Sequence, residues 1–241
     1  QQMTNLPKAM RSQLEQEYPL LRLKPADLQV SALDGTRKYL FVLADGQMVE
    51  SVWMHYRHGD SVCISSQAGC RMGCRFCASA IGGLVRDLTA QEMLEQVYAV
   101  GRDVGTRVSH VVVMGTGEPL DNYSNLLRFI RLISHEQGMQ ISQRNLTVST
   151  CGIVPRIYEV AREKVQITLA LSLHGATDEK RQELMPIAKK YSLDEVMKAC
   201  DFYFQNTKRR MTYEYSLVGG VNDTQEDVWQ LAQLLRGRNC H

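Results

Sequence analysis

Three cysteines crowd into one short segment of this sequence and form its strongest chemical signal. Cys70, Cys74 and Cys77 follow the spacing C-x3-C-x2-C, directly after a run that predicts a strand, Ser61–Ser66. A structural zinc site needs four ligands, usually in two separated pairs. Three close thiolates suit a [4Fe–4S] cluster instead, with one iron left without a protein ligand. The spacing therefore predicts an iron–sulfur site at these three residues.

The open iron of such a cluster would determine the chemistry. It can chelate the amino and carboxylate groups of S-adenosylmethionine (SAM), and an electron from the cluster then cleaves the sulfonium to give a 5′-deoxyadenosyl radical. The protein would supply position and shielding, because the cofactors supply the reactivity. The alternative is a structural zinc ion completed by His55, His58 or His110. The spacing and its place after a strand favour the cluster.

Further polar residues follow other predicted strands. Gly115-Thr-Gly-Glu118-Pro119 comes after the predicted strand His110–Met114, where Glu118 could accept a hydrogen bond from an ammonium group. Glycines in such a turn let the backbone approach a ligand closely. Ser149 and the trio Ser172-Leu173-His174 also stand at strand ends. For each of these segments taken alone, an ordinary polar turn is the commoner explanation.

Alternating strands and helices are expected to position these residues. The strands predicted from apolar runs are Ser61–Ser66, His110–Met114, Leu146–Ser149, Gln166–Leu173 and Met211–Val218. The helices predicted between and after them begin at the capping box Thr89–Glu92, cover Asn125–His135 and Val154–Glu163, begin again at the capping box Ser192–Glu195, and end with Thr224–Leu235. This order predicts an α/β fold, a partial (β/α) barrel with parallel strands and outer helices. Functional residues of such a barrel lie at the C-terminal ends of the strands.

The first part of the chain does not show this alternation of strands and helices. Residues 4–18 show a helical stripe of Leu6, Met10, Leu14 and Tyr18, and Tyr39–Leu43 with Met48–His55 predicts a hairpin around Asp45-Gly46. We therefore divide the chain into an N-terminal extension, residues 1–57, and the barrel, residues 58–241. Because the sequence stops where a sixth strand is due, we expect the barrel to lack its last strand and C-terminal segment.

The amino-acid composition limits the classes of protein to which this chain can belong. The 241 residues are 44% hydrophobic and 22% charged, with a net charge of +2, which is typical of a globular protein. The apolar runs are too short to cross a bilayer, and the N-terminus lacks a signal-peptide core. We expect a cytoplasmic monomer with no membrane contact. The seven cysteines do not indicate a secreted disulfide scaffold, because such chains are shorter and richer in cysteine.

Longer strings around these motifs resemble the RlmN family of radical SAM enzymes, which methylate C2 of adenine in 23S ribosomal RNA and in certain transfer RNAs. The similar strings are CISSQAGCRMGCRFCASAIGGLVRDLT, VVVMGTGEPLDNY, TVSTCGIVP, LALSLHGATDEKR, LMPI and EYSLVGGVND. The likeness extends from about Met48 to His241. The cysteine loop is shared by many radical SAM enzymes, whereas the surrounding strings are far more specific.

The resemblance implies a role for each matching position. Cys70, Cys74 and Cys77 would bind the [4Fe–4S] cluster. The residues implied to contact SAM are Gly117, Glu118, Ser149, Ser172, Leu173 and His174. Cys63 matches a catalytic cysteine outside the cluster, and Glu50 matches the proton acceptor. Without the resemblance, Cys63 would be interpreted as a small buried residue of a strand.

The resemblance also implies a mechanism. Two SAM molecules would be used, and a second cysteine would be methylated and carry the methyl carbon to the base; no cysteine in this sequence matches that carrier. Cys63 would release the product and leave a disulfide for an outside reductant to reopen. Either Glu50 or Cys63 could take the proton. An external electron donor is also implied.

Three other functions stay open at this stage. The Cfr-type relatives methylate C8 of the same base, and other radical SAM enzymes act on substrates that are not RNA. A zinc-stabilised RNA-binding module would not be an enzyme at all.

Overall fold

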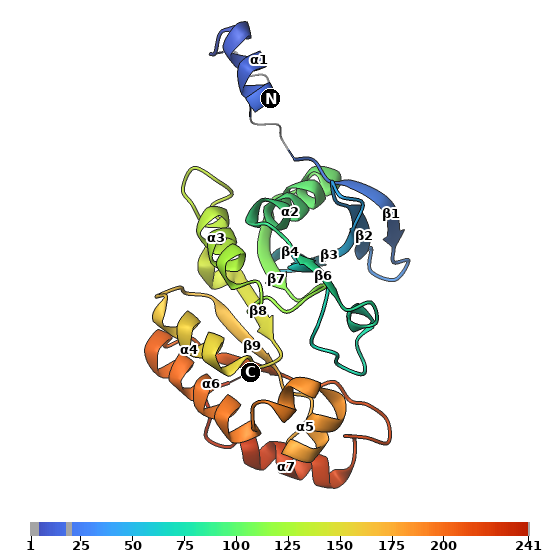
Figure 1. Ribbon diagram of the computed structural model, residues 1–241, viewed down its shortest axis with the longest axis vertical. Helices are drawn as coiled ribbons and strands as arrows, with labels where there is room; N and C mark the ends of the chain where they lie inside the picture. Colours follow the sequence, from blue (N-terminus) through green and yellow to red (C-terminus); the bar gives the residue numbers. More distant parts are fainter. Residues whose placement is uncertain (1–4, 18–20, 241) are drawn as a thin grey trace.

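One mixed eight-stranded sheet organises the chain in the computed structural model, which describes residues 5–17 and 21–240 (Figure 1). The strands, in their order across the sheet, are β1 (Lys24–Val30), β2 (Arg37–Val42), β3 (Met48–Tyr56), β4 (Gly59–Ile64), β7 (Val108–Val113), β8 (Leu146–Thr150), β9 (Thr168–Ser172) and β10 (Met211–Glu214). The first four pair antiparallel, and the strands from β4 to β10 pair parallel. Cys240 adds an isolated parallel bridge to Met211.

Helices connect the parallel strands, as the predicted barrel requires. They are α2 (Ala90–Val104), α3 (Tyr123–Ile133), α4 (Val154–Arg162), α5 (Asp178–Leu184), α6 (Leu193–Thr207) and α7 (Gln225–Leu235), with α1 (Lys8–Glu17) preceding the sheet. Figure 1 shows the helices outside a curved sheet. The predicted α/β class, with parallel strands and outer helices, is confirmed.

Local sequence explains where the long helices begin. Thr89 and Glu92 form the predicted capping box of α2, and Ser192 with Glu195 forms that of α6. In each box the hydroxyl accepts from the third backbone N–H while the carboxylate accepts from the cap residue's N–H. An N-cap contributes about 1 kcal/mol to helix stability. These signals are local, so the sequence alone locates both helix starts.

Several elements differ from the predictions. β10 ends at Glu214 rather than Val218, because the following backbone turns away: the Ser216 N–H donates to His174 Nδ1, and the Val218 N–H donates to Asn222 Oδ1. β1, α5 and the short pair β5 (Gln67–Gly69) and β6 (Leu84–Asp87) were not predicted.

The predicted N-terminal helix forms, but its apolar stripe is not covered. No residue of α1 is buried, and Met10 is 50% exposed. In Figure 1 this helix stands apart from the sheet. The predicted residue Tyr18 lies outside the described residues. The predicted hairpin is observed as β2 and β3, and the division at residues 57 and 58 falls in the turn that leads into β4 and stays a prediction.

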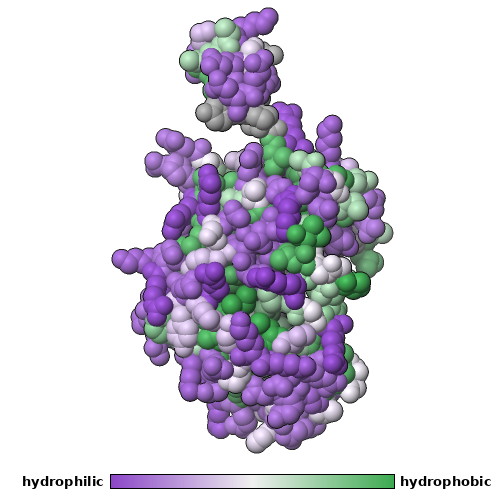
Figure 2. Space-filling view, viewed as in Figure 1, coloured by the Kyte–Doolittle hydropathy of each residue, from purple (hydrophilic) through white to green (hydrophobic). Residues whose placement is uncertain are grey.

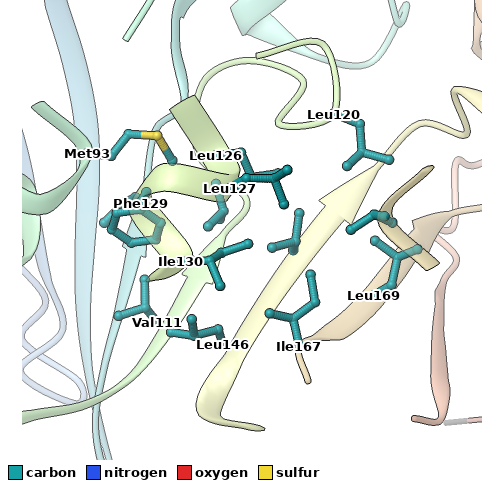
Figure 3. Close-up of a cluster of buried hydrophobic side chains, with 14 of the residues drawn as sticks. Met93, Val111, Leu120, Leu126, Leu127, Phe129, Ile130, Leu146, Ile167 and Leu169 are labelled. Atoms are coloured by element: carbon teal, nitrogen blue, oxygen red, sulfur yellow. The ribbon is translucent and has the colours of Figure 1, made fainter. Parts of the chain in front are cut away.

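The hydrophobic core lies between the helices and one face of the sheet (Figure 3). Phe129 and Ile130 of α3 and Met93 of α2 are fully buried with Val111 of β7 and Leu146 of β8. Full burial of each such side chain contributes about 1.5–3 kcal/mol. β9, predicted from the apolar run Gln166–Leu173, is buried through Leu169, Ala170 and Leu171, as a strand covered on both faces is.

The opposite face of the sheet carries polar side chains. Because side chains alternate along a strand, the residues between the core positions point away from the helices. These residues are Glu50 and Val52 of β3, Cys63 of β4, His110 and Val112 of β7, Thr147 and Ser149 of β8, Ser172 of β9 and Glu214 of β10. We call this the helix-free face. It is only half-buried at Cys63, Ser149, Ser172 and Glu214.

Hydrophilic residues cover most of the face drawn in Figure 2. In the described part of the chain, no helix has the length and apolar content needed to cross a membrane.

Candidate active site

The cysteine loop leaves the C-terminal end of β4 and is closed by a small antiparallel pair. β5 and β6 frame it, and the Cys70 N–H donates to the Gly83 carbonyl oxygen at 2.9 Å. Gly69 has φ of 75°, and a Cβ there would lie 2.0 Å from the same oxygen. Only glycine fits this backbone approach. Within the loop, the Cys77 N–H donates to the Cys74 carbonyl oxygen at 3.1 Å, which folds the last two cysteines toward each other.

The three loop cysteines are free thiols in a shared electrostatic environment. Burial, with smaller contributions from the charges of Cys70 and Cys77, raises the pKa of the Cys74 thiol to about 12. The pKa of Cys70 is raised too, by burial first and then by neighbours that include Cys77. Thiolates that raise one another's pKa in this way repel one another, and a cationic group between them would relieve the repulsion. The donor set therefore fits an iron cluster.

The histidines of the zinc alternative lie elsewhere. His55 Nδ1 lies 2.6 Å from Asp60 Oδ1, and the His58 and His110 rings contact each other with centroids 4.8 Å apart. These residues surround the first residues of β4, whereas the cysteine loop follows its last residue. Across residues 5–17 and 21–240, no three His, Cys, Asp or Glu side chains are grouped closely enough to hold a single metal ion.

The predicted glycine-rich turn packs against the base of the cysteine loop. The Gly115 N–H donates to the Ile64 carbonyl oxygen at 3.0 Å, and the Thr116 carbonyl oxygen accepts from the N–H groups of Ser66 and Gln67. A Cβ on Gly117 would lie 2.5 Å from the Gln67 Cβ. The glycines therefore allow close contact with the neighbouring chain segment as well as with any ligand.

Glu118 lies at the centre of this packing. Its Oε2 accepts from the Cys151 N–H at 2.7 Å, and its Oε1 accepts from the Leu120 N–H at 3.0 Å. The side chain is buried, and burial raises the pKa of the carboxyl above its ordinary value. A carboxylate has about four acceptor sites, so two backbone donors leave it able to accept from a ligand.

Ser149 and Ser172, predicted separately, meet on the helix-free face. Their Oγ atoms lie 3.2 Å apart, and Oε2 of Glu214 accepts from Ser172 at 3.3 Å and from Ser149 at 3.4 Å. Glu214 was not predicted as a site residue. The signal for it is the parallel register, which pairs Glu214 with Ser172 across β10 and β9. That register depends on the fold and cannot be obtained from local sequence.

The other two members of the predicted trio have different environments. Leu173 is fully buried, so its side chain belongs to the core and only its backbone is available to a ligand. The backbone of His174 has φ of 51°, its ring packs edge-on against Phe76 of the cysteine loop, and its Nδ1 accepts from the Ser216 N–H. Burial lowers the pKa of the imidazole to about 4, with a smaller contribution from Arg181, so the ring is neutral at pH 7.

Arg181 is a buried cation that the sequence did not single out. It is fully buried in α5, and its guanidinium donates to the carbonyl oxygens of Cys151 at 2.6 Å and Leu173 at 3.2 Å. Burial lowers the pKa of this arginine. Through these bonds Arg181 joins the ends of β8 and β9, the two strands that carry the paired serines.

We predict that Arg181→Met lowers the free energy of unfolding by about 2–4 kcal/mol, because it leaves buried carbonyl oxygens without donors. Urea unfolding followed by circular dichroism would measure the change. The control is Arg128→Met on the exposed face of α3, which should shift stability by less than about 0.5 kcal/mol. Equal effects of the two substitutions would contradict the role given to Arg181.

Cys63 and Glu50 lie on the helix-free face of adjacent strands. Cys63 pairs with Val52, two residues beyond Glu50 on β3. Burial raises the pKa of the Cys63 thiol to about 11, and the charges of Glu214 and Glu50 add to the effect. Glu50 is half-exposed and pairs with Lys38 at 2.6 Å between Oε1 and Nζ. The two residues predicted for catalysis therefore face the same space, and Glu214 joins them.

Comparison with known proteins adds to this geometry. The sequence profile of the Radical SAM superfamily matches residues 64–235. A "Probable dual-specificity RNA methyltransferase RlmN" of Lachnoclostridium phytofermentans is 56% identical over 241 residues, which are 100% of this chain and 68% of the relative. The protein of the same description from Lachnospira eligens is 58% identical over 238 residues, or 99% of this chain and 68% of the relative.

A solved structure is similar throughout the chain. The crystal structure of a radical SAM methyltransferase from Sphaerobacter thermophilus superposes with a TM-score of 0.94 and is 44% identical. The superposition covers 99% of this chain and 71% of that protein.

Proposed function

Because the chain belongs to the radical SAM superfamily and, within it, to the RlmN-type RNA methyltransferases, we propose that it methylates C2 of an adenine in 23S ribosomal RNA and in transfer RNA. The predicted family and the predicted cofactors, a [4Fe–4S] cluster and SAM, are confirmed. The observation that carries the proposal is the convergence of the cysteine loop, Glu118, the Ser149–Ser172 pair and Cys63 at the C-terminal ends of the parallel strands.

The residues divide into two groups by what they would hold. Cys70, Cys74 and Cys77 would ligate the cluster, since they are the free thiols of one closed loop. SAM would contact the residues between the loop and the strand ends: Gly117, Glu118, Ser149, Ser172, His174 and the backbone of Leu173. When bound, the two cofactors supply a carbon radical, which adenine C2 requires because it offers no nucleophilic electron pair.

Glu118 would accept a hydrogen bond from the N–H groups of the SAM amino group. Burial raises the pKa of the Glu118 carboxyl, so the folded state favours the protonated form. The stability that this preference contributes is fully present below the ordinary pKa of a glutamate and is lost as pH rises through the folded pKa. A hydrogen bond donated to the carboxylate favours its charged form. SAM affinity should therefore increase as pH rises above the ordinary value of a glutamate.

We predict that Glu118→Gln weakens SAM binding by about 1.5–3 kcal/mol, or roughly ten- to a hundredfold, and flattens its pH dependence. Isothermal titration calorimetry on the reconstituted protein between pH 5 and 8 would measure both. Glu95→Gln is the matched control, because Glu95 is also a buried carboxylate but pairs with Arg102 on α2. Unchanged SAM affinity in the Glu118 variant would reduce the GTGEP segment to a structural turn.

Cys63 would free the product from the enzyme. The proposed reaction uses two SAM molecules. A methylated cysteine carries the methyl carbon to the base, and we assign no residue of this chain to that role. The Cys63 thiolate would attack that carrier sulfur and break its bond to the carbon now attached to adenine. The adduct would first return its unpaired electron to the cluster. The carbon would then leave with the electron pair and take up a proton to complete the methyl group, while the two sulfurs form a disulfide that an external thiol reductant reopens.

The proton of C2 would go to a carboxylate. Because burial raises the pKa of the Cys63 thiol to about 11, this thiol is mostly protonated at pH 7, which favours a carboxylate as the base. Glu50 faces the same space and is assigned as the acceptor; Glu214, held between two serines, is the second carboxylate beside Cys63.

Transfer of an isotopic label from SAM to RNA tests the proposal. The chain joined to the flanking segments of the L. phytofermentans relative, with a reduced cluster, should convert an unmodified transfer RNA and a 23S ribosomal RNA fragment to products containing 2-methyladenosine. Nucleoside mass spectrometry would identify the position. Formation of 8-methyladenosine would establish the Cfr-type reaction instead, and SAM cleavage without RNA labelling would indicate a different substrate.

A further inference from the structure

Basic residues gather at the edge of the sheet opposite the cysteine loop. Because the strands from β4 to β10 are parallel, the segments that lead into them lie along one edge. We call residues 56–58, 105–107, 134–145, 163–167 and 208–210 the entry rim. Its basic residues are Arg57 before β4, Arg107 before β7, Arg144 before β8, Lys164 before β9, and Lys208, Arg209 and Arg210 before β10.

Few acids balance this charge. The acidic residues of the entry rim are Glu136 and Glu163, and Glu163 pairs with Arg131. In the described part of the chain, no carboxylate pairs with Arg107, Lys164 or Lys208, and all three are exposed. Since the whole chain has a net charge of only +2, the rim carries more positive charge than the protein as a whole. A concentrated basic edge on a nearly neutral chain indicates a polyanionic partner.

At the mouth of the candidate active site, arginines are paired with carboxylates. Arg71 of the cysteine loop pairs with Asp121, and Arg86 pairs with both Asp45 and Glu92. Because these guanidinium groups already bind carboxylates, they are less available to contact phosphates.

Aromatic side chains accompany the rim cations. A cavity of about 420 Å³ extends from the rim along the sheet. Tyr56, His58, Arg144 and Asn145 line it at the rim, and the rest of its lining is Met54, Ser61, His110, Val112, Met114 and Thr147. Tyr56 and His58 stack with centroids 5.2 Å apart and planes 7° from parallel, and Tyr56 is 45% exposed. Exposed aromatic rings next to cations are the usual platform for unpaired bases of single-stranded RNA.

From this combination we infer that the entry rim is a second RNA-contact surface, which binds phosphates through its cations and an unpaired base through Tyr56. The inference rests on the proposed function, in which the substrate is RNA. A strand of six residues spans about 20 Å, so a folded RNA whose target base enters at the cysteine loop can also reach the opposite edge. An acidic electron-donor protein fits less well, because it has to approach the cysteine loop.

Salt-dependent RNA binding tests the rim. The probe is an unmodified transfer RNA transcript, and the variant is the triple substitution Arg107→Gln, Lys164→Gln and Lys208→Gln. We expect at least a tenfold loss of affinity at low salt, and a plot of log affinity against log salt that is flatter by about 2 to 3, because each lost phosphate contact removes about one released counterion. Tyr56→Ala should weaken binding on the order of tenfold, whereas Tyr56→Phe should not.

The control removes the same number of cations from outer helices: Arg128→Gln, Arg156→Gln and Lys198→Gln. Arg128 and Lys198 are exposed and Arg156 is half-buried, and Arg156 and Lys198 pair with Glu159 and Asp194. This control should leave both affinity and salt slope within about twofold of the parent. If the rim variant behaves like the control, the rim proposal is overturned while RNA binding by the protein stands. If the parent itself binds no RNA at low salt, the proposed RNA substrate fails together with the rim.

Discussion

Replacing Cys70, Cys74 and Cys77 together by alanine should give a folded protein that holds no iron. The backbone of the loop is fixed by groups that the substitution leaves in place, above all the bond from the residue 70 N–H to Gly83 and the close approach at Gly69. In the proposed site the thiols are ligands, and Cys74 also packs against the cluster of Cys151, Leu184 and Met185. After anaerobic reconstitution, the parent should contain about four irons per chain and the variant none.

Iron analysis and the brown absorbance of the cluster measure this result, and circular dichroism verifies the fold. Cys200→Ala is the control, because Cys200 is a fully buried core residue of α6. That variant should lose about 1 kcal/mol of stability and keep its iron. One tightly bound zinc in the native protein, or iron retained by the triple variant, would contradict the cluster assignment.

Sequence was sufficient wherever a signal is local. The capping boxes at Thr89 and Ser192, the apolar strand around Leu169 and the cysteine spacing all lie within a few neighbouring residues, so each could be interpreted before any fold was known. The same holds for the partial barrel, which follows from the alternation of such segments.

The missed elements have no local signal. β1 contains Pro25 and Asp27, has no buried residue, and exists because its backbone pairs with β2 at the edge of the sheet. α5 is seven residues long and strongly polar, and Arg181 inside it is buried by groups from β8 and β9. Tertiary context determines both, which intrinsic propensity cannot anticipate.

In the candidate site, too, some features have local sequence signals and others depend on the fold. Ser149, Ser172 and Glu118 could be selected because each ends or follows a strand, but their grouping requires the register of three parallel strands. Glu214 becomes a site residue only through that register. The sequence also could not divide the proton transfer between Glu50 and Cys63, because the burial that raises the pKa of Cys63 is a property of the folded sheet.

The second large effect is expected from removal of the Cys63 thiol. In the chain joined to the flanking segments of a relative, Cys63→Ala should keep its cluster, bind SAM and methylate the carrier cysteine, yet stall with RNA covalently attached. No other thiol on the helix-free face of the described strands could attack the carrier sulfur. The stalled species would appear as a shifted protein band that disappears on nuclease treatment.

The pH dependence of release in the parent gives an independent measurement. At pH 7 only about one Cys63 thiol in ten thousand is ionised if its pKa is about 11. Since the thiolate is the nucleophile, the rate of product release in a single turnover should rise nearly tenfold per pH unit between pH 7 and 9. Normal turnover by Cys63→Ala would make Cys63 a packing residue of β4. Loss of iron in that variant would instead identify Cys63 as a fourth cluster ligand, and the iron left open for SAM would no longer exist.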